Sequence, residues 1–317
     1  MRLISLVPTN TKINFLKFRK IAAVLSLLLC VASAGIFSAK GLNFGIDFRG
    51  GILIEIRTQG PADISKLRGT LSGLGLGEVQ LQEFGQASDV LIRIERQAGG
   101  EKAQLVAVEL AKKALGNEVN YRRTEFVGPK VGGELIEAGV TAVLLALGAM
   151  LVYIWFRFEW QFGVGAVVAL LHDVLLTIGI FALLGLEFNL STVAAILTIA
   201  GYSINDTVVV YDRVRENLRK YKQMPLAELL NVSINSTLSR TLLTSVTTLL
   251  ALSALYFFGG EVLAGFSFAM IWGVIVGTYS SIFIAVPLLV YMKLRRTGLI
   301  VGDTNGDDAA AAGKSAN

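Results

Sequence analysis

The chain has 317 residues, of which 53% are hydrophobic, and its mean hydropathy is +0.61. Soluble domains of this length rarely carry so much apolar sequence, so the composition excludes an ordinary water-soluble fold. The formal net charge is +5, but the basic residues stand at the ends of apolar runs rather than in one patch, which argues against a nucleic-acid partner. Cys30 is the only cysteine, so a disulfide within the chain is excluded.

Six apolar runs are long enough, or nearly so, to supply the roughly 20 residues of helix that cross a hydrocarbon core. They cover residues 21–39, 136–156, 163–184, 190–211, 240–258 and 265–291. We therefore predict an α-helical polytopic membrane protein, with transmembrane helix 1 at 21–39 and a five-helix transmembrane domain over 136–296. An alternative for the first run is a cleaved signal peptide, because basic residues precede it and small residues lie near its end. The run is longer than a usual signal core, which favours a membrane helix.

The distribution of Lys and Arg in the short connections predicts the orientation. Basic residues are frequent in the N-terminal segment 1–20, after the fourth run and after the sixth run, whereas the connections 185–189 and 259–264 contain none. We therefore place both termini in the cytoplasm. The polar, Ala- and Gly-rich tail 297–317 is predicted to be a disordered cytoplasmic segment.

Residues 40–135 then form a domain on the far, periplasmic side of the membrane. Their patterns alternate between strand and helix, with strands at 51–58, 78–84, 89–95 and 118–128 and helices at 62–75 and 101–116. The order β-α-β-β-α-β predicts an α+β ferredoxin-like domain between transmembrane helices 1 and 2. Such a unit has no chemistry of its own, so function cannot be read from this fold.

Two short motifs flank this domain and are rich in glycine. GIDFRGG (45–51) follows the first membrane run, and VGPKVGG (127–133) precedes the second. Glycine permits tight turns and close packing, so these positions are candidate hinges, with a rigid turn as the alternative. The candidate hinge residues are Gly45, Gly50, Gly51, Gly128, Gly132 and Gly133. Gly273 and Gly277 form a GxxxG pattern in the sixth run, which favours close approach of a helix from this chain or from a partner.

Charged residues inside the apolar runs are the strongest functional signal. An ionised Asp at the centre of a membrane helix costs about 2.5–3.5 kcal/mol on insertion scales, so an intramembrane carboxylate is a functional hypothesis by default. Asp206 stands five residues before the predicted inner end of the fourth run, and Asp173 stands near the middle of the third, beside His172. Adjacent residues on a helix point about 100° apart, so we do not expect His172 and Asp173 to share one site well, and the alternative for either residue is an interhelical hydrogen bond.

Asp206 has a candidate partner in Arg240, which we place at the same depth on the fifth run. Desolvation favours the protonated form of Asp206 and a nearby Arg favours the ionised form, so the carboxyl group can gain and lose a proton. We predict that Asp206 alternates between pairing with Arg240 and a protonated, unpaired state; the alternative is a static contact between two helices. The polar residues expected to support the site are Tyr202, Ser203, Asn205, Thr237, Thr241, Thr244 and Thr248.

These motifs occur in a characteristic order along the chain. GIDFRGG, VGPKVGGEL (127–135), LLHDVLL (170–176) and GYSINDTVVVYDRVRENLR (201–219) are followed by SRTLLTSVTTLLALSALYFFGG (239–260) and GFSFAMIWGVIVGTYSS (265–281). Together they resemble the SecF family of bacterial protein-export membrane subunits, within the resistance-nodulation-division superfamily. The resemblance extends from about residue 10 to about residue 295.

The resemblance implies a multi-pass protein of the bacterial inner membrane that works with SecD and uses the proton gradient to help pull exported polypeptides outward. Asp206 and Arg240 stand where that family carries its coupling pair. It implies no catalytic residue, no metal and no cofactor apart from the proton gradient. The expected partners are SecD, the SecYEG channel with its small membrane subunits, the translocating preprotein and the lipid bilayer.

Other functions remain open at this stage. An intramembrane aspartyl protease would also need two carboxylates, and Tyr211 and Asp212 form a YD pair, but no GxGD motif accompanies it. A proton-driven small-molecule efflux permease of the same superfamily usually has two such halves and larger outer domains. A passive scaffold for the export channel is the third alternative. The sequence also leaves open whether sodium replaces the proton.

Overall fold

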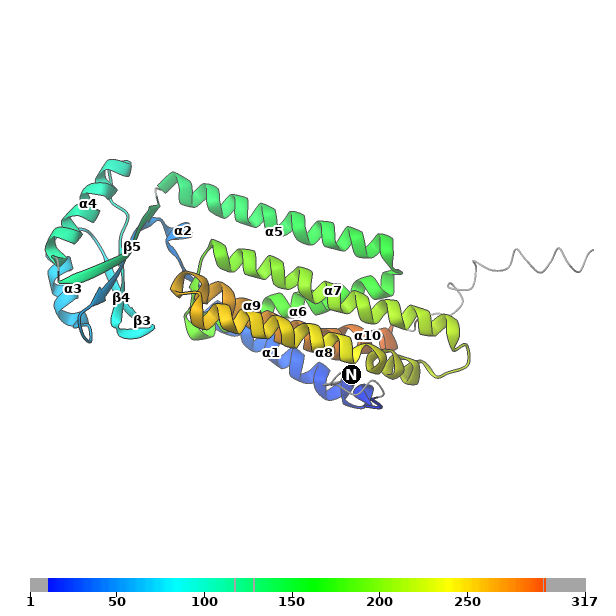
Figure 1. Cartoon of the computed structure of the whole chain (residues 1–317). Helices are drawn as coiled ribbons and strands as arrows, with labels where there is room; N and C mark the ends of the chain where they lie inside the picture. The colour runs from blue at the N-terminus through cyan, green and yellow to red at the C-terminus, as the bar shows by residue number, and fades with distance from the viewer. Residues whose placement is uncertain (1–10, 117, 128, 293, 295–317) are drawn as a thin grey trace, which may run out of the picture. The chain divides into compact units, whose positions relative to one another are not determined.

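The structure is a computed structural model that describes residues 11–116, 118–127, 129–292 and 294 (Figure 1). The chain divides into two compact units. The first comprises Met1–Gly41, Ala146–Leu183 and Ala195–Asn317, and the second comprises Leu42–Leu145 and Leu184–Ala194. The helices α5 and α7 each have residues in both units. The predicted tail 297–317 lies outside the described residues.

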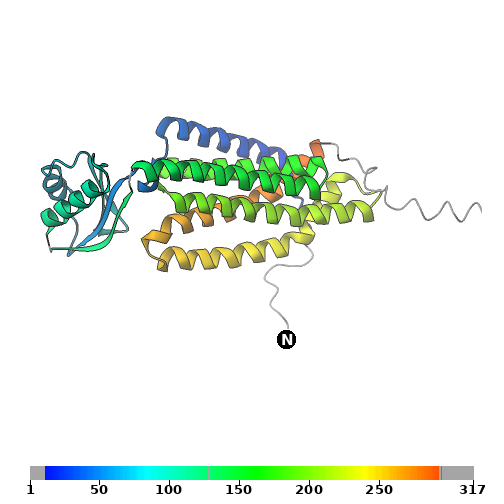
Figure 2. The same ribbon diagram turned by 90° about the horizontal axis from the view of Figure 1, so that it is seen from above.

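Six helical spans in the described chain are long and apolar enough to cross a membrane, which confirms the predicted number. The elements that form them are η1 (Phe15–Phe18) with α1 (Arg19–Lys40), α5 (Pro129–Arg157), α6 (Trp160–Leu184), α7 (Leu190–Lys220), α8 (Leu226–Phe258), and α9 (Glu261–Ser280) with η2 (Ser281–Ala285) and α10 (Val286–Tyr291). Helices α6 to α9 run side by side in both views of the bundle (Figures 1 and 2).

Three of these helices extend well beyond the predicted apolar runs. Helix α8 begins at Leu226, directly after Pro225, rather than at residue 240, because its first turns are amphipathic and bury Leu229 and Leu230. Helix α7 continues to Lys220, and α5 begins at Pro129, inside the stretch predicted to belong to the periplasmic domain. An apolar-run criterion misses such ends because amphipathic turns carry polar residues on one face.

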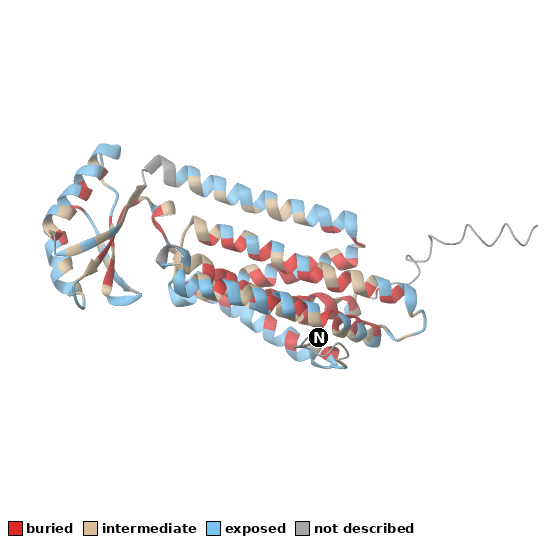
Figure 3. Cartoon of the chain, viewed as in Figure 1, coloured by how far each residue is buried: buried red, intermediate tan, exposed pale blue. Residues whose placement is uncertain are grey.

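Residues of α6, α7 and the last helices contribute to the apolar core of the first unit. Tyr211 is fully buried and packs edge-to-face on Phe162, with ring centroids 5.0 Å apart. A Cβ atom at Gly165 would overlap the Tyr211 hydroxyl, so glycine is required at this contact. Figure 3 shows that buried residues are frequent in α7 and α9, whereas α5 is exposed along most of its length.

The second unit contains a four-stranded antiparallel sheet in the order β3-β4-β2-β5. Its elements are β2 (Gly51–Thr58), α3 (Ile64–Ser72), β3 (Val79–Phe84), β4 (Gln86–Ile94), α4 (Gly100–Leu115) and β5 (Val119–Val127). Both helices cover the same face of the sheet (Figure 1). The predicted element order is confirmed, and the strand order fits a ferredoxin-like domain.

Two small elements in the second unit were not predicted. The GIDFRGG motif contains a one-turn helix, α2 (Ile46–Arg49), and the residues before it form β1 (Asn43–Phe44), which pairs in parallel with β6 (Glu187–Phe188). Asp47 Oδ2 accepts a hydrogen bond from the backbone N–H of Leu190, the first residue of α7, at 2.9 Å. Arg93 of β4 forms an ion pair with Glu187 at 2.5 Å. These contacts join the sheet and the GIDFRGG motif to the start of α7.

The structure separates the candidate hinge glycines into two groups. Gly50 and Gly51 have φ angles of 69° and 113°, which glycine adopts without strain, and a Cβ atom at Gly51 would lie 2.7 Å from the Ile94 carbonyl oxygen. A Cβ atom at Gly45 would lie 2.5 Å from Glu187 Oε1, so the first motif is closely packed.

The second motif differs, because Gly132 and Gly133 lie inside α5 and not in a turn, contrary to the prediction. Gly128 lies outside the described residues. Hinge motion at any of these glycines stays a prediction.

Candidate functional site

Helix α7 carries polar residues on two of its faces. Tyr202 and Asp206 face α8, whereas Ser203, Thr207 and Tyr211 contact α6 and the α9–η2–α10 segment. Each series has a spacing of four residues, which keeps its members on one side of a helix with 3.6 residues per turn. The faces therefore form two separate polar contacts within one apolar bundle.

Asp206 is buried between α7 and α8, with 7% of its surface exposed. The Thr241 hydroxyl donates a hydrogen bond to Oδ1 at 2.8 Å. The other carboxyl oxygen, Oδ2, is buried and has no hydrogen-bond partner among the residues that the structure describes. An unsatisfied buried carboxylate oxygen costs free energy, so Oδ2 is a favourable position for a proton or for an incoming donor.

Arg240 does not form an ion pair with Asp206 in the described part of the chain. Its side chain is exposed on α8, one residue before Thr241, and it lies near enough for its charge to act on the Asp206 carboxyl group. The structure therefore has the unpaired arrangement of the two residues. The predicted alternation between paired and unpaired states stays a prediction.

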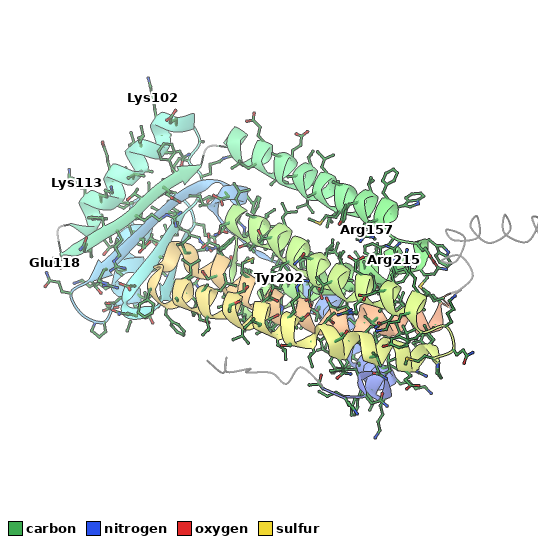
Figure 4. All side chains as sticks on the ribbon, turned by 45° about the vertical axis from the view of Figure 1, so that its right-hand side comes forward. Lys102, Lys113, Glu118, Arg157, Tyr202 and Arg215 are labelled. Carbon is green, nitrogen blue, oxygen red and sulfur yellow. The ribbon has the colours of Figure 1, made fainter. Side chains whose placement is uncertain are left out.

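The other residues predicted to support Asp206 divide between several positions. Tyr202, near the middle of α7 in Figure 4, donates to Ser245 of α8 at 3.5 Å, the outer limit of a hydrogen bond. Thr237 and Thr244 donate to carbonyl groups of their own helix. Asn205 is exposed.

Thr248 of α8 is half-buried, and Ser203 belongs to the other polar face of α7. Of the seven supporting residues predicted from the sequence, Thr241 is the one that contacts the Asp206 carboxyl group.

Asp173 of α6 is the centre of the second polar contact and is fully buried. Its Oδ2 accepts hydrogen bonds from the hydroxyl groups of Ser203 at 2.6 Å and Ser280 at 2.8 Å. Its Oδ1 lies 2.9 Å from His172 Nδ1. The expectation that these adjacent residues would not share a site is therefore wrong. The two side chains leave the helix in different directions, but the imidazole ring still reaches the neighbouring carboxylate.

Two further contacts continue this polar face along α7. The hydroxyl groups of Thr207 and Ser281 are 2.8 Å apart, and the Tyr211 hydroxyl donates to the Ala285 carbonyl at 3.1 Å. Ser281 and Ala285 are the first and last residues of η2, a π-helix that ends two residues before Pro287. Proline lacks the N–H of a regular helix, and π-helical turns are frequent at functional sites. Sequence reasoning missed this segment; the proline was its only local signal.

The GxxxG glycines of α9 pack against this same side of α7. A Cβ atom at Gly273 would overlap the Ile199 side chain, and one at Gly277 would lie 3.1 Å from Ser203 Cβ. The motif therefore serves helix packing within the chain, which was one of its two predicted uses.

One end of the bundle carries an ion pair between α5 and α7. Arg157 donates to Asp212 at 2.7 Å, and the guanidinium groups of Arg157 and Arg215 lie 5.0 and 5.4 Å from the Phe158 ring centroid (Figure 4). The paired Arg157 and Asp212 side chains are more than one-third exposed, so this contact contributes little to stability.

Comparison with known proteins supplies the family. A family model described as protein export membrane protein SecD/SecF, C-terminal, matches residues 107–295, and one described as SecD/SecF GG motif matches residues 35–62. The protein translocase subunit SecF of Rickettsia rickettsii (strain Sheila Smith) is 48% identical over 295 residues, covering 92% of this chain and 95% of the relative. The chain belongs to the SecF family. SecF of Rickettsia bellii (strain OSU 85-389) is 49% identical over 288 residues, covering 90% of this chain and 94% of the relative.

Solved structures agree with the SecF assignment. The crystal structure of SecDF, a translocon-associated membrane protein from Thermus thermophilus, is 40% identical and superimposes with a TM-score of 0.82 over 92% of this chain. SecDF in a super-membrane-facing form gives a TM-score of 0.66 over 91% of this chain. This SecF-family chain matches 40% of the SecDF chain in each case. The predicted family and the multi-pass membrane fold are thus confirmed.

Proposed function

We propose that this SecF-family chain, together with SecD, couples the proton gradient across the bacterial inner membrane to late movement or release of exported polypeptides. The observation that carries the proposal is the half-satisfied carboxyl group of Asp206, buried between two membrane helices. Its Oδ2 accepts a proton in one state and attracts the nearby Arg240 guanidinium in the other. The chain itself catalyses no chemical reaction in this scheme.

The driving energy is of the right size for such a switch. One elementary charge that crosses 100 mV releases about 2.3 kcal/mol, and a conformational equilibrium is often biased by only a few kcal/mol. Protonation of Asp206 removes the attraction to Arg240, whereas ionisation restores it. The preferred separation of α7 and α8 around Thr241 therefore depends on the proton.

Helix α7 offers a route from this switch to the sheet domain. Its first residue, Leu190, donates to Asp47 of the GIDFRGG motif, and Glu187 just before it pairs with Arg93 of β4. A displacement of α7 along its axis strains both contacts. The sheet domain is thereby made to follow the membrane helix without any chemistry of its own.

The proposed surroundings follow from the family and from the charge pattern. Both termini are cytoplasmic, the sheet domain is periplasmic, and SecD completes the helix bundle. The SecDF chain supports SecD as the partner, because it contains much more than the 40% that this chain matches. The super-membrane-facing form has the same sequence identity to this chain but a lower TM-score, which supports a conformational change of the SecDF-type protein during polypeptide export. The SecYEG channel and the passenger polypeptide are the proposed contacts of the assembled pair.

The test is export into inverted membrane vesicles, with and without a proton gradient, from cells that carry Asp206→Asn. We expect the gradient-dependent part of export to be lost while the gradient-independent part remains. Asp212→Asn is the matched control, because it removes a carboxylate from the same helix at the exposed Arg157 contact. If export by stably assembled Asp206→Asn still depends fully on the proton gradient, coupling through Asp206 is wrong and the passive scaffold remains. If a sodium gradient alone restores gradient-dependent export by the native chain, sodium is the coupling ion instead of the proton.

A further inference from the structure

His172 is the only histidine in the chain, and it is buried in the middle of α6 with 4% of its surface exposed. Its Nδ1 atom lies 2.9 Å from Asp173 Oδ1. Its Nε2 atom is buried and has no hydrogen-bond partner within the described residues. An imidazole with one nitrogen held and the other free has an open position for a proton.

Polar groups surround both carboxyl oxygens of Asp173. The hydroxyl groups of Ser203 and Ser280 donate to Oδ2, and His172 Nδ1 lies within hydrogen-bond distance of Oδ1. A buried carboxylate also requires a compensating charge. Among the described residues, no Lys or Arg forms an ion pair with Asp173. Among the described residues in hydrogen-bond contact with Asp173, His172 is the one that can supply a positive charge.

The other titratable groups near the pair are thiol, phenol and carboxyl groups, which carry no positive charge in any form. From α1, Cys30 lies near enough to feel the charge of Asp173. From α9, the Tyr279 ring lies 6.0 Å from the His172 ring, and its hydroxyl is hydrogen-bonded to Ser26 of α1 at 2.9 Å. From α7, Asp206 lies three residues beyond Ser203 but on the face toward α8. None of these groups supplies the positive charge.

We propose that the His172–Asp173 pair is a second proton-binding site in the membrane domain, distinct from Asp206. A proton that arrives from water binds to Nε2 of the neutral imidazole and forms an N–H bond. The product is an imidazolium whose Nδ1–H donates to the Asp173 carboxylate, and release of the same proton restores the neutral ring. No other bond forms or breaks, and the carboxylate stays ionised throughout.

A proton suits this site better than a metal ion. Two hydroxyl groups already lie at 2.6 and 2.8 Å from Oδ2, which leaves that oxygen no free coordination position. Protonation of His172 places a positive charge beside the Asp173 carboxylate, and this carboxylate is the group on α6 that accepts hydrogen bonds from Ser203 of α7 and Ser280 of α9. The site does not require the role proposed for Asp206, and either assignment can fail alone.

The single histidine permits a direct test by solid-state NMR. The full-length chain, purified without a histidine tag and with isotope-labelled imidazole nitrogens, is reconstituted in lipid vesicles and measured over a pH series. The signal that disappears in His172→Gln belongs to this ring. We expect its two nitrogens to change from the neutral to the imidazolium pattern as the pH falls, in the native chain and in Asp206→Asn alike.

Variants at the carboxylate test the role of its charge. Asp173→Asn is expected to move the transition to lower pH, because the imidazolium loses its counter-charge. Ser280→Ala removes one hydrogen bond to Oδ2 and keeps the carboxylate, so it is expected to move the transition less than Asp173→Asn does. Thr207→Val, which contacts Ser281 and not Asp173, is the control and leaves the transition in place. One unchanging form of the ring over the pH series, or a transition that Asp173→Asn and Ser280→Ala both leave unmoved, overturns the proposal.

Discussion

The two polar faces of α7 hold their carboxyl groups in opposite ways. Toward α6 and α9, Asp173 has hydrogen bonds on both oxygens and no exposed surface. Toward α8, Asp206 has one hydrogen bond, one unsatisfied oxygen and an exposed Arg240 nearby. Both groups are buried in helices of membrane-spanning length, so burial alone does not distinguish them.

We infer from this difference that the number of hydrogen bonds to a buried carboxyl group, more than the extent of its burial, decides whether the group stays in place or moves. A fully hydrogen-bonded group resists change, because moving it breaks several contacts at once. A half-satisfied group is already strained and gains from a new partner. We therefore expect the contact among α6, α7 and α9 to persist during the proposed proton-coupled transport cycle, while the contact between α7 and α8 changes.

The largest expected effect is on stability, at the satisfied carboxylate. Asp173→Leu leaves His172, Ser203 and Ser280 without their partner, so we expect a loss of about 3 kcal/mol or more in the free energy of unfolding. Asp206→Leu removes one hydrogen bond and one unsatisfied oxygen, so its cost is expected to be about 1 kcal/mol or less. Denaturant unfolding in mixed micelles compares the two. Equal losses would remove the proposed contrast.

The next effect concerns the close approach of α9 to the side of α7 that carries Ser203. Gly273→Ala places a Cβ atom against the Ile199 side chain, and such overpacking costs about 1–3 kcal/mol. Gly265→Ala on the same helix is the matched control, because a Cβ atom there meets nothing within 4 Å. Thermal unfolding of both variants measures the difference. If Gly273→Ala is as stable as the control, α7 and α9 do not approach each other closely at this position.

A smaller effect is expected on the α8 side of α7. Thr241→Val keeps the shape of the side chain and removes the hydrogen bond to Asp206, at a cost of about 1 kcal/mol. Thr244→Val, which loses only bonds to its own helix at an exposed position, should cost less. Unfolding midpoints of the two variants test this order. A larger loss for Thr244→Val would mean that Thr241 does not hold Asp206.

The last prediction concerns the stability contribution of a carboxylate outside the membrane helices, Asp89, as a reference for the two carboxyl groups inside them. A side-chain hydrogen bond from Arg57 holds the pKa of Asp89 in β4 below its ordinary value, against the opposing effect of burial. A group with a lowered pKa stabilises the fold above its ordinary pKa, and this contribution disappears as the pH falls through the lowered value. Because Arg57 is partly exposed, we expect a contribution on the order of 1 kcal/mol.

Amide hydrogen exchange in β2 and β4 of the full chain, corrected for intrinsic rates, measures this contribution as the pH is lowered. Protection should fall in the acidic range, and Asp89→Asn should remove the pH-dependent part. The exposed Glu118→Gln is the control and should leave the native pH profile unchanged. A profile that Asp89→Asn does not alter would show that the Arg57 contact is broken in solution.

The sequence predicted the parts of the fold that depend on periodicity. The six membrane helices and the β-α-β-β-α-β order both follow from apolar spacing, which reports local structure directly. It did not predict β1 with β6, because two-residue strands far apart in the chain leave no periodic signal. The amphipathic start of α8 was missed for a related reason, since an apolar-run criterion rejects mixed faces.

The sequence predicted which residues belong to the candidate site but not which of them are in contact. Asp206, Arg240 and Thr241 were named because polar residues are rare in apolar runs, but which of them touch depends on rotamers that the sequence does not fix. The same limit explains His172 and Asp173, whose backbone directions differ while their side chains meet. The π-helix at Ser281–Ala285 depends on tertiary contacts to α7.

The most direct test asks which carboxyl group exchanges its proton. Infrared difference spectra of the full chain in lipid vesicles are recorded as the pH falls from mildly alkaline to mildly acidic, above the range in which exposed carboxylates titrate. We predict a protonated-carboxyl band that is lost in Asp206→Asn and retained in Asp173→Asn. A band that persists in Asp206→Asn, or that disappears in Asp173→Asn alone, would contradict the assignment of the switch to Asp206.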